Sequence, residues 1–295
     1  MGYLFLSLAL FAGAAKGFCG KKISGFAQNT TSAVLLNLFR MLLCVAFSAL
    51  LLFVMGDARA LVLTKQVVVA SAVSGVATAL FVVSWLLAVR KSAYMMLDVF
   101  LMLGTLIPML LSLFIFSEPI GIRQWIGFGV LLVAAYIMCS YNNSIKTALT
   151  PSSFFLLILC GAANGIADAS QKVFVRTAPD VPISIFNLYT YIIAALVLAL
   201  FFVLSPNKER VGFQKGHTRV ALVYLLIMAV ALTANSYFKT TAALYLDSAR
   251  LYPINQAASL ILSTLMATFF FKERLTAKAV VGIVLSFVAL MLMNL

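Results

Sequence analysis

Apolar runs about as long as a membrane is thick recur from one end of this chain to the other. A helix rises about 1.5 Å per residue, so about 20 mostly apolar residues cross the ~30 Å hydrocarbon core of a bilayer. The runs here are about 18 to 24 residues long. A transmembrane barrel would instead alternate polar and apolar residues in segments of about ten, and the sequence lacks that pattern. The chain is therefore predicted to be an all-α integral membrane protein.

Short charged breaks and breaks with Pro, Asn or Gly divide the sequence into ten predicted transmembrane helices. Their expected ranges are 3–20, 31–55, 66–89, 93–116, 122–140, 153–174, 182–204, 219–244, 248–271 and 276–294. The longest polar connection, 205–217, leaves no room for a soluble domain. With 64% hydrophobic and 10% charged residues, the composition indicates a multi-pass protein, which we expect in the plasma or inner membrane.

Motifs for metal binding, cofactors and enzymatic catalysis are missing. The cysteines, Cys19, Cys44, Cys139 and Cys160, show no C-x-x-C spacing, and the single histidine, His217, lies in a polar connection. No Gly-rich phosphate loop, H-E-x-x-H or G-x-S-x-G is present. The net charge of +13 lies in loops that meet anionic lipid headgroups, so it does not indicate nucleic acid. We expect no metal, no cofactor and no enzyme.

Short motifs recur in the same order in the two halves of the chain. GAAKG at 13–17 returns as GAANG at 161–165, a separation of 148 residues. Two further matches, 150 and 155 residues apart, pair NLFR at 37–40 with NLYT at 187–190, and Glu118 and Gly127 with Glu273 and Gly282. The first span ends in small residues like a secretory signal, but it has no positively charged start and its motif recurs in mid-chain. We therefore expect a transmembrane helix there.

The recurrence predicts two repeats of five helices each, at 1–146 and 147–295. Because five is odd, the second repeat enters the membrane from the opposite side. Many secondary transporters are built as inverted repeats of this kind, and their substrate site lies near the midplane between the halves.

These motifs resemble the EamA-type branch of the drug/metabolite transporter superfamily. The resembling residues are Lys16 and the glycines of the first span, Arg40, 88–90, Pro108, FKERLT at 271–276 followed by Gly282, and a degenerate counterpart, FSEPI, at 116–120. The resemblance implies a ten-helix exporter or facilitator of small metabolites or drugs and fixes no substrate. Small four-helix relatives carry a glutamate in the first helix for proton and cation exchange. Here that helix has Lys16 and no acid, which argues against lipophilic-cation antiport by their mechanism.

Polar residues at helical spacing in many spans predict a shared polar interior. The predicted substrate-binding residues are Lys16, Asn37, Arg40, Trp85, Tyr94, Asp98, Asn164, Asp168, Asn187, Tyr191, Asn235, Lys239, Asn255 and Gln256. Ordinary hydrogen bonds between membrane helices, worth about 0.6 to 2 kcal/mol, are the alternative for any uncharged member. A charge at the centre of a membrane helix costs about 2.5 to 3.5 kcal/mol on insertion scales. The charged members must therefore be paired, hydrated or close to an interface.

Simpler structural roles remain open for several motif residues. Asp168 and Lys172 have the spacing of an i,i+4 ion pair. Glu118 and Glu273 have the position of capping or pairing groups at a membrane boundary. The glycines of GAAKG and GAANG have the spacing of close-packing sites, which is compatible with lining a cavity.

A secondary transporter working by alternating access through a central cavity is the function that the sequence favours. The competing class is a polytopic membrane enzyme or lipid-handling protein, which would gather acids, histidines or nucleophiles near one interface, whereas the acids here are dispersed. Lys16, Arg40 and Lys239 against Asp98 and Asp168 leave the predicted interior about +1, which favours a zwitterionic or anionic solute. Proton coupling is possible, the bilayer is the other partner, and the protein is expected to be a monomer or a homodimer.

Orientation in the membrane is indicated in opposite senses by charge and by family. Connections after odd-numbered spans hold twelve Lys and Arg residues, at 21, 22, 90, 91, 146, 208, 210, 215, 219, 272, 274 and 278, whereas those after even-numbered spans hold six. The positive-inside rule then leaves both termini outside, and the resemblance implies the reverse. We follow the resemblance, because the motifs themselves place several of these charges. A reporter fused at Leu295 that fluoresces only in the cytoplasm should be bright; a dark reporter supports the charge rule instead.

Overall fold

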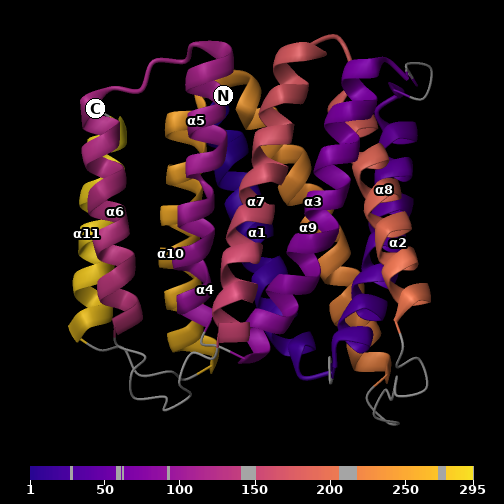
Figure 1. The fold of residues 1–295 in the computed structure, drawn as a ribbon, viewed down its shortest axis with the longest axis horizontal. Coiled ribbons are helices and arrows are strands. Elements are labelled where there is room, and N and C mark those ends of the chain that lie inside the picture. Colours follow the sequence, from indigo (N-terminus) through magenta and orange to yellow (C-terminus); the bar gives the residue numbers. More distant parts are fainter. Residues whose placement is uncertain are drawn as a thin grey trace.

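The chain folds into a bundle of roughly parallel and antiparallel helices (Figure 1). The computed structural model describes residues 1–26, 29–57, 61, 63–91, 94–140, 151–205, 218–271 and 277–294, and no strand occurs in these ranges. The helices are α1 (Gly2–Ser24), α2 (Thr30–Val54), α3 (Lys65–Lys91), α4 (Tyr94–Gly104), α5 (Leu106–Phe116), α6 (Ile122–Ser140), α7 (Pro151–Thr177), α8 (Ile183–Leu204), α9 (Thr218–Tyr245), α10 (Ser248–Phe271) and α11 (Ala277–Asn294).

Each predicted span coincides with a helix, but the prediction of one unbroken helix over 93–116 was wrong. That span is divided into α4 and α5 at Thr105. The cause is Pro108, which has no N–H to give to the carbonyl of Gly104 four residues earlier and whose ring crowds that carbonyl. The Thr105 hydroxyl donates to the Met102 carbonyl at 2.7 Å and satisfies part of the broken turn.

Length and apolarity identify the molecule as a multi-pass membrane protein. Within the described ranges, seven helices are long and apolar enough to cross a bilayer: α1, α2, α3, α7, α8, α9 and α10. Shorter apolar helical segments cover Phe100–Phe116, Ile122–Ala134 and Val280–Met293. Large apolar side chains such as Phe11, Phe53 and Phe114 point outward and are more than two-thirds exposed, as expected of a surface that meets lipid.

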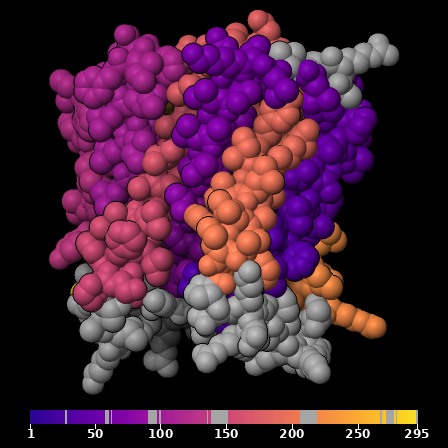
Figure 2. Space-filling model, turned by 45° about the vertical axis from the view of Figure 1, so that its right-hand side comes forward, coloured from indigo at the N-terminus to yellow at the C-terminus, as the bar shows by residue number. Residues whose placement is uncertain are grey.

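Helices from the two halves of the chain interleave and do not form two separate blocks. α1 packs along α9, α3 along α7, α2 along α8, and α6 along α11. The α6–α11 pair forms one edge of the bundle, α2 and α8 lie at the other, and both termini lie at the same end (Figure 1). Figure 2 shows α8, in orange, directly against the indigo to purple helices of the first half. The interior is therefore bounded by α1, α3, α4, α7, α9 and α10.

Glycines bring the backbones of α4 and α7 into direct contact. A β-carbon added to Gly165 would overlap the carbonyl oxygen of Gly104, one on Gly104 would overlap that of Gly161, and one on Gly161 would overlap that of Phe100. The GAANG glycines thus serve as close-packing positions, as one of the open alternatives had it. This approach fixes the α7 face that carries Asn164 beside α4.

Substitution of Gly165 by alanine should force these two helices apart. Overpacking of this kind costs about 1–3 kcal/mol, so Gly165→Ala should lower the unfolding temperature of the detergent-purified protein. Gly129→Ala is the matched control, because a β-carbon on Gly129 meets nothing within 4 Å and alanine is the better helix former. Equal unfolding temperatures for the two variants would contradict the role assigned to the α4–α7 contact.

Candidate functional site

A polar cavity lies inside the bundle between α1, α3, α4, α7, α9 and α10. It holds about 640 Å³ of space between its atoms, open solvent at its mouth included. Eight of the predicted site residues line it: Lys16, Trp85, Asp98, Asn164, Asn235, Lys239, Asn255 and Gln256. The structure thus brings to one place side chains from six helices that span nearly the whole sequence.

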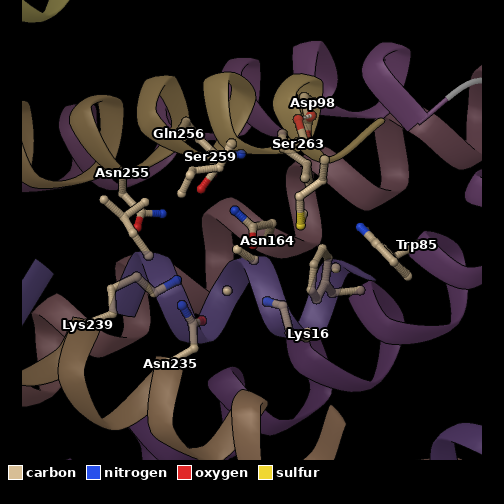
Figure 3. Close-up of a pocket in the computed structure, with 18 residues that line it drawn as sticks. Lys16, Trp85, Asp98, Asn164, Asn235, Lys239, Asn255, Gln256, Ser259 and Ser263 are labelled. Atoms are coloured by element: carbon tan, nitrogen blue, oxygen red, sulfur yellow. Dashed lines mark hydrogen bonds between the residues drawn. The ribbon is translucent and has the colours of Figure 1, made fainter. Parts of the chain in front are cut away.

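The cavity has two facing walls (Figure 3). Asn255, Gln256 and Ser259 line one side from α10, at the i, i+1 and i+4 positions that share a helix face. Lys16 of α1 lies on the opposite side together with two residues of α9. Asn164 of α7 lies between the walls, so the cavity is surrounded by amide and ammonium groups that can donate to a ligand.

Lys16 presents an ammonium group that no described carboxylate neutralises. The side chain is half-buried, and its Nζ lies 5.8 Å from the centroid of the Phe81 ring, within the range of a cation–π contact. The ring offsets part of the cost of the charge but takes none of its three hydrogen-bond donors. Because Lys16 lines the cavity, those donors are available to a solute there.

Lys239 is neutralised by Asp168, which lies behind the cavity wall. The two side chains form a buried salt bridge between α9 and α7. Asn164 donates to the second carboxylate oxygen of Asp168 at 3.4 Å, and the Tyr252 hydroxyl donates to the Asp168 backbone carbonyl at 2.7 Å. This network joins α7, α9 and α10 and holds the Lys239 ammonium at the cavity surface.

Asp98 supplies the negative charge in the lining itself. Its carboxylate is 9% exposed and accepts a hydrogen bond of 2.5 Å from the hydroxyl of Ser263 on α10. None of the described basic residues forms a salt bridge with it. Asn235, by contrast, is held by its own amide, which donates to the Ala9 carbonyl of α1 at 2.6 Å.

Arg40 lies deeper, beside a smaller cavity that adjoins the first. This second cavity also has Lys16, Phe81 and Trp85 in its lining. It leaves about 10 Å³ for the centre of a water-sized molecule, against about 70 Å³ in the main cavity. Arg40 is 3% exposed, and its guanidinium contacts the Met228 sulfur at 3.4 Å. A buried guanidinium with a thioether as its hydrogen-bond partner is under-satisfied, because sulfur is a weak acceptor.

Asn37, Asn187 and Tyr191 do not line the main cavity and instead join helices. The Asn37 amide donates to the carbonyls of Ala33 and Val82, at 2.8 and 3.1 Å. Asn187 accepts from the Ser236 hydroxyl at 2.9 Å, and the Tyr191 hydroxyl donates to the Leu232 carbonyl at 3.3 Å. Tyr94 begins α4, but its side chain lies outside the described part of the molecule.

Lys172 pairs with Glu118 and not with Asp168, so the i,i+4 pair that the spacing left open does not form. Its ammonium lies 2.8 Å from Glu118 Oε1 and caps the end of α9 by donating to the Ala243 and Leu246 carbonyls. Arg176 donates to the same carboxylate at 2.6 Å, and Glu118 accepts from the Ser248 backbone N–H at the start of α10. Glu118 thus pairs with two basic residues of α7 and accepts from the start of α10, so tertiary packing and not helical spacing decides the partner of Lys172. The prediction of a capping role for Glu118 is confirmed, while Glu273 lies outside the described residues.

The charge state of Glu118 follows from this network. Burial alone raises the pKa of the carboxyl, but hydrogen bonds from Lys172, the Ser248 N–H and Arg176 outweigh burial and leave the pKa below its usual range. The carboxylate therefore stays ionised and bridges the α5–α6 connection to α7 and α10.

Sequence reasoning missed the apolar part of the lining. Leu10, Phe81, Leu101, Leu262 and Met266 contribute to the cavity, and no polar pattern marks them. Phe81 alone had a usable signal, because it lies four residues before Trp85 on the same face of α3. In the described part of the chain no three His, Cys, Asp or Glu residues cluster as metal ligands would.

Comparisons with known proteins give one family and one fold. Residues 152–295 match the model of the EamA-like transporter family. No curated protein matches the chain. Among the solved structures 28 chains match. One of them, described only as the crystal structure of a protein, superposes with a TM-score of 0.71 and 16% identity over 97% of this chain and 96% of its own. At that identity the likeness shows the fold alone.

The Asp168–Lys239 salt bridge should be far more sensitive to removal of one partner than of both. Removing one partner of a buried pair typically costs about 3–5 kcal/mol, because it leaves the other charge uncompensated. Asp168→Asn and Lys239→Met should therefore each lower the unfolding temperature markedly, and the double variant should recover part of that loss. A double-mutant cycle measured by thermal unfolding checks this, and strictly additive losses would show that the two charges are not coupled.

Proposed function

The chain belongs to the EamA-like transporter family, and from that premise we propose that it moves a small amphipathic organic solute, zwitterionic or anionic, across the membrane. The cavity between α1, α3, α4, α7, α9 and α10 is the proposed substrate site. The main support for this proposal is the composition of the lining. It contains the Lys16 ammonium, the Asp98 carboxylate and four amide side chains, together with the aromatic rings of Phe81 and Trp85.

We propose an inverted repeat of five helices each, at 1–146 and 147–295, as the framework for alternating access. Helix pairing supports it, because exchanging the first five spans with the last five turns the α1–α9 contact into the α7–α3 contact and leaves α2–α8 and α6–α11 unchanged. The buried asparagines agree: Asn37 of α2 bonds to Val82 of α3, and Asn187 of α8 bonds to Ser236 of α9. The two asparagines are 150 residues apart in the sequence, and their bonding partners, Val82 and Ser236, are 154 apart.

Corresponding positions of the two halves also line the cavity. Lys16 and Asn164 are 148 residues apart, Phe81 and Asn235 as well as Trp85 and Lys239 are 154 apart, and Leu101 and Gln256 are 155 apart. In the last three pairs the first-half residue is aromatic or aliphatic, and the second-half residue is an amide or a lysine. A pseudo-symmetric cavity with one apolar and one polar side suits a solute that has a flat or bulky apolar part and a polar head.

The charged residues of the cavity indicate where each group of the solute binds. Lys16, with no described carboxylate beside it, binds the anionic group, and Asn164 binds a polar one. Asp168 acts from behind the wall by holding Lys239. Asp98 is the matching site for a cationic group of a zwitterion. It is also the candidate for proton coupling, because it is buried and forms no salt bridge with a described basic residue. The substrate enters from and leaves to opposite faces of the cell membrane, with a monomer or homodimer as the working unit.

An uptake assay in proteoliposomes tests the proposal. The panel pairs amino acids that have aromatic or aliphatic side chains with small polar amino acids, organic acids, sugars, nucleosides and quaternary ammonium dyes. Saturable uptake of amphipathic zwitterions or anions above protein-free liposomes is the expected result. Robust transport of quaternary ammonium compounds, with none of the amino or organic acids, would overturn the proposed selectivity.

Lys16→Met keeps the apolar stem of the side chain and removes its charge. Transport should fall by about tenfold or more, because the charge-assisted bond to the anionic group is lost. Expression and unfolding temperature should hold, since no described residue depends on the ammonium for a salt bridge. Lys22→Met, in the last turn of the same helix, is the matched control and should transport normally. If Lys16→Met also transports normally with unchanged preference, the lysine only reaches toward the membrane surface.

A further inference from the structure

The smaller cavity beside Arg40 contains two cations and no carboxylate. Arg40 reaches it from α2 and Lys16 from α1, and Phe81, Trp85 and Met228 complete most of the enclosure. Four of the described carboxylates are engaged elsewhere: Asp57 with Ser184, Asp98 with Ser263, Glu118 with Lys172 and Arg176, and Asp168 with Lys239. The protein therefore supplies no counter-charge here from the part of the chain that the structure describes.

Arg40 itself carries an unused donor in this enclosed place. Its side chain is 97% buried, given an exposed fraction of 3%, and its Nε has no hydrogen-bond partner among the described residues. One terminal nitrogen contacts the Met228 sulfur at 3.4 Å. A guanidinium presents five donors in a planar fork that matches an oxyanion, so a buried one facing a cavity with a weak acceptor is suited to a ligand.

The two cavities adjoin, because three residues line both of them. These are Lys16, Phe81 and Trp85, and Figure 3 shows Lys16 and Trp85 near each other in the lining of the main cavity. Lys16 is thus in a position to contact a group in either cavity. A ligand whose apolar part packs on the two aromatic side chains can extend its charged group past Lys16 toward Arg40.

We infer that Arg40 and Lys16 form an inner subsite for one oxyanion, a carboxylate or a phosphate, that is either part of the transported solute or a free inorganic anion. Arg40 holds the oxyanion through its fork, and Lys16 adds charge from the side of the main cavity. This subsite rests on the proposed function for its route of entry. Its binding chemistry, however, is measurable without transport.

The binding experiment uses the purified full-length protein in detergent at fixed pH and ionic strength. Sodium phosphate or sodium acetate replaces sodium chloride stepwise, and the unfolding temperature is recorded. We expect a saturable rise for the wild type and, for Arg40→Gln, about a tenfold or greater increase in the oxyanion concentration that gives half the rise. Arg40→Lys should retain part of the response, since it keeps the charge and loses the fork. Arg219→Gln, a change at an exposed arginine near the start of α9, should respond fully.

Folding of the variants is checked in chloride alone. Arg40→Gln removes a buried charge whose hydrogen bond is to a thioether, so its unfolding temperature should equal or exceed that of the wild type. If it fails to fold, Lys16→Met and Arg40→Lys test the same subsite from its other member and with the charge kept. Equal oxyanion responses in the wild type and in every folded variant would overturn the subsite.

Competition separates the two sources of the oxyanion. Competitive inhibition of uptake by phosphate or acetate, lost in Arg40→Gln, assigns the subsite to the solute's own group. Additive stabilisation by solute and phosphate, without competition, assigns it to a free inorganic anion. A protein that binds oxyanions through Arg40 but transports nothing in the panel would overturn the proposed function and leave the subsite in place. Transport with an unchanged response to Arg40→Gln would do the reverse.

Discussion

A charge inside a bilayer must be matched by another group, and the polar interior of this protein is arranged around that constraint. Asp168 neutralises Lys239, and Glu118 neutralises Lys172 while also capping the start of α10. These contacts connect α7 to α9, α10 and the α5–α6 connection. Each charge would be costly in an isolated membrane helix, but as pairs the charges connect the helices of the bundle. Among the basic residues of the two cavities, Lys16 and Arg40 have no described carboxylate as a partner, and this marks them as groups for a ligand.

Close backbone packing is the second condition for the cavity. The glycines of α4 and α7 let the two helices touch along their backbones, which leaves no room for side chains on that face. Asp98 and Asn164 lie outside the glycine contact and line the cavity together with residues of α10 and α9.

In the proposed inverted repeat, the asymmetry of the cavity lining follows from how the two halves differ at matching positions. Phe81 and Trp85 on α3 correspond to Asn235 and Lys239 on α9, so the same helix face is aromatic in one half and polar in the other. A site built in this way orients an amphipathic solute without needing a different fold in each half. Under the proposed function, divergence between the repeats, more than their shared motifs, sets the substrate.

The sequence by itself determined the class of the protein and the places of its helices. The thickness of the bilayer sets the length of an apolar run that can span it as a helix, and both this length and the positions of Pro and Gly are local properties of the sequence. It also identified eight residues of the cavity, since a polar side chain in a membrane helix has few other places to go. The bonding partners of the polar side chains, in the cavity and outside it, were decided by the tertiary structure alone. Lys172 meets Glu118 across 54 residues of chain instead of Asp168 on its own helix, and Asn37, Asn187 and Tyr191 join helices away from the main cavity. Spacing along one helix says which face a residue shares, but only the packing of other helices onto that face decides its partner. Aliphatic lining residues such as Leu10 and Leu262 have no sequence feature that separates a cavity from lipid.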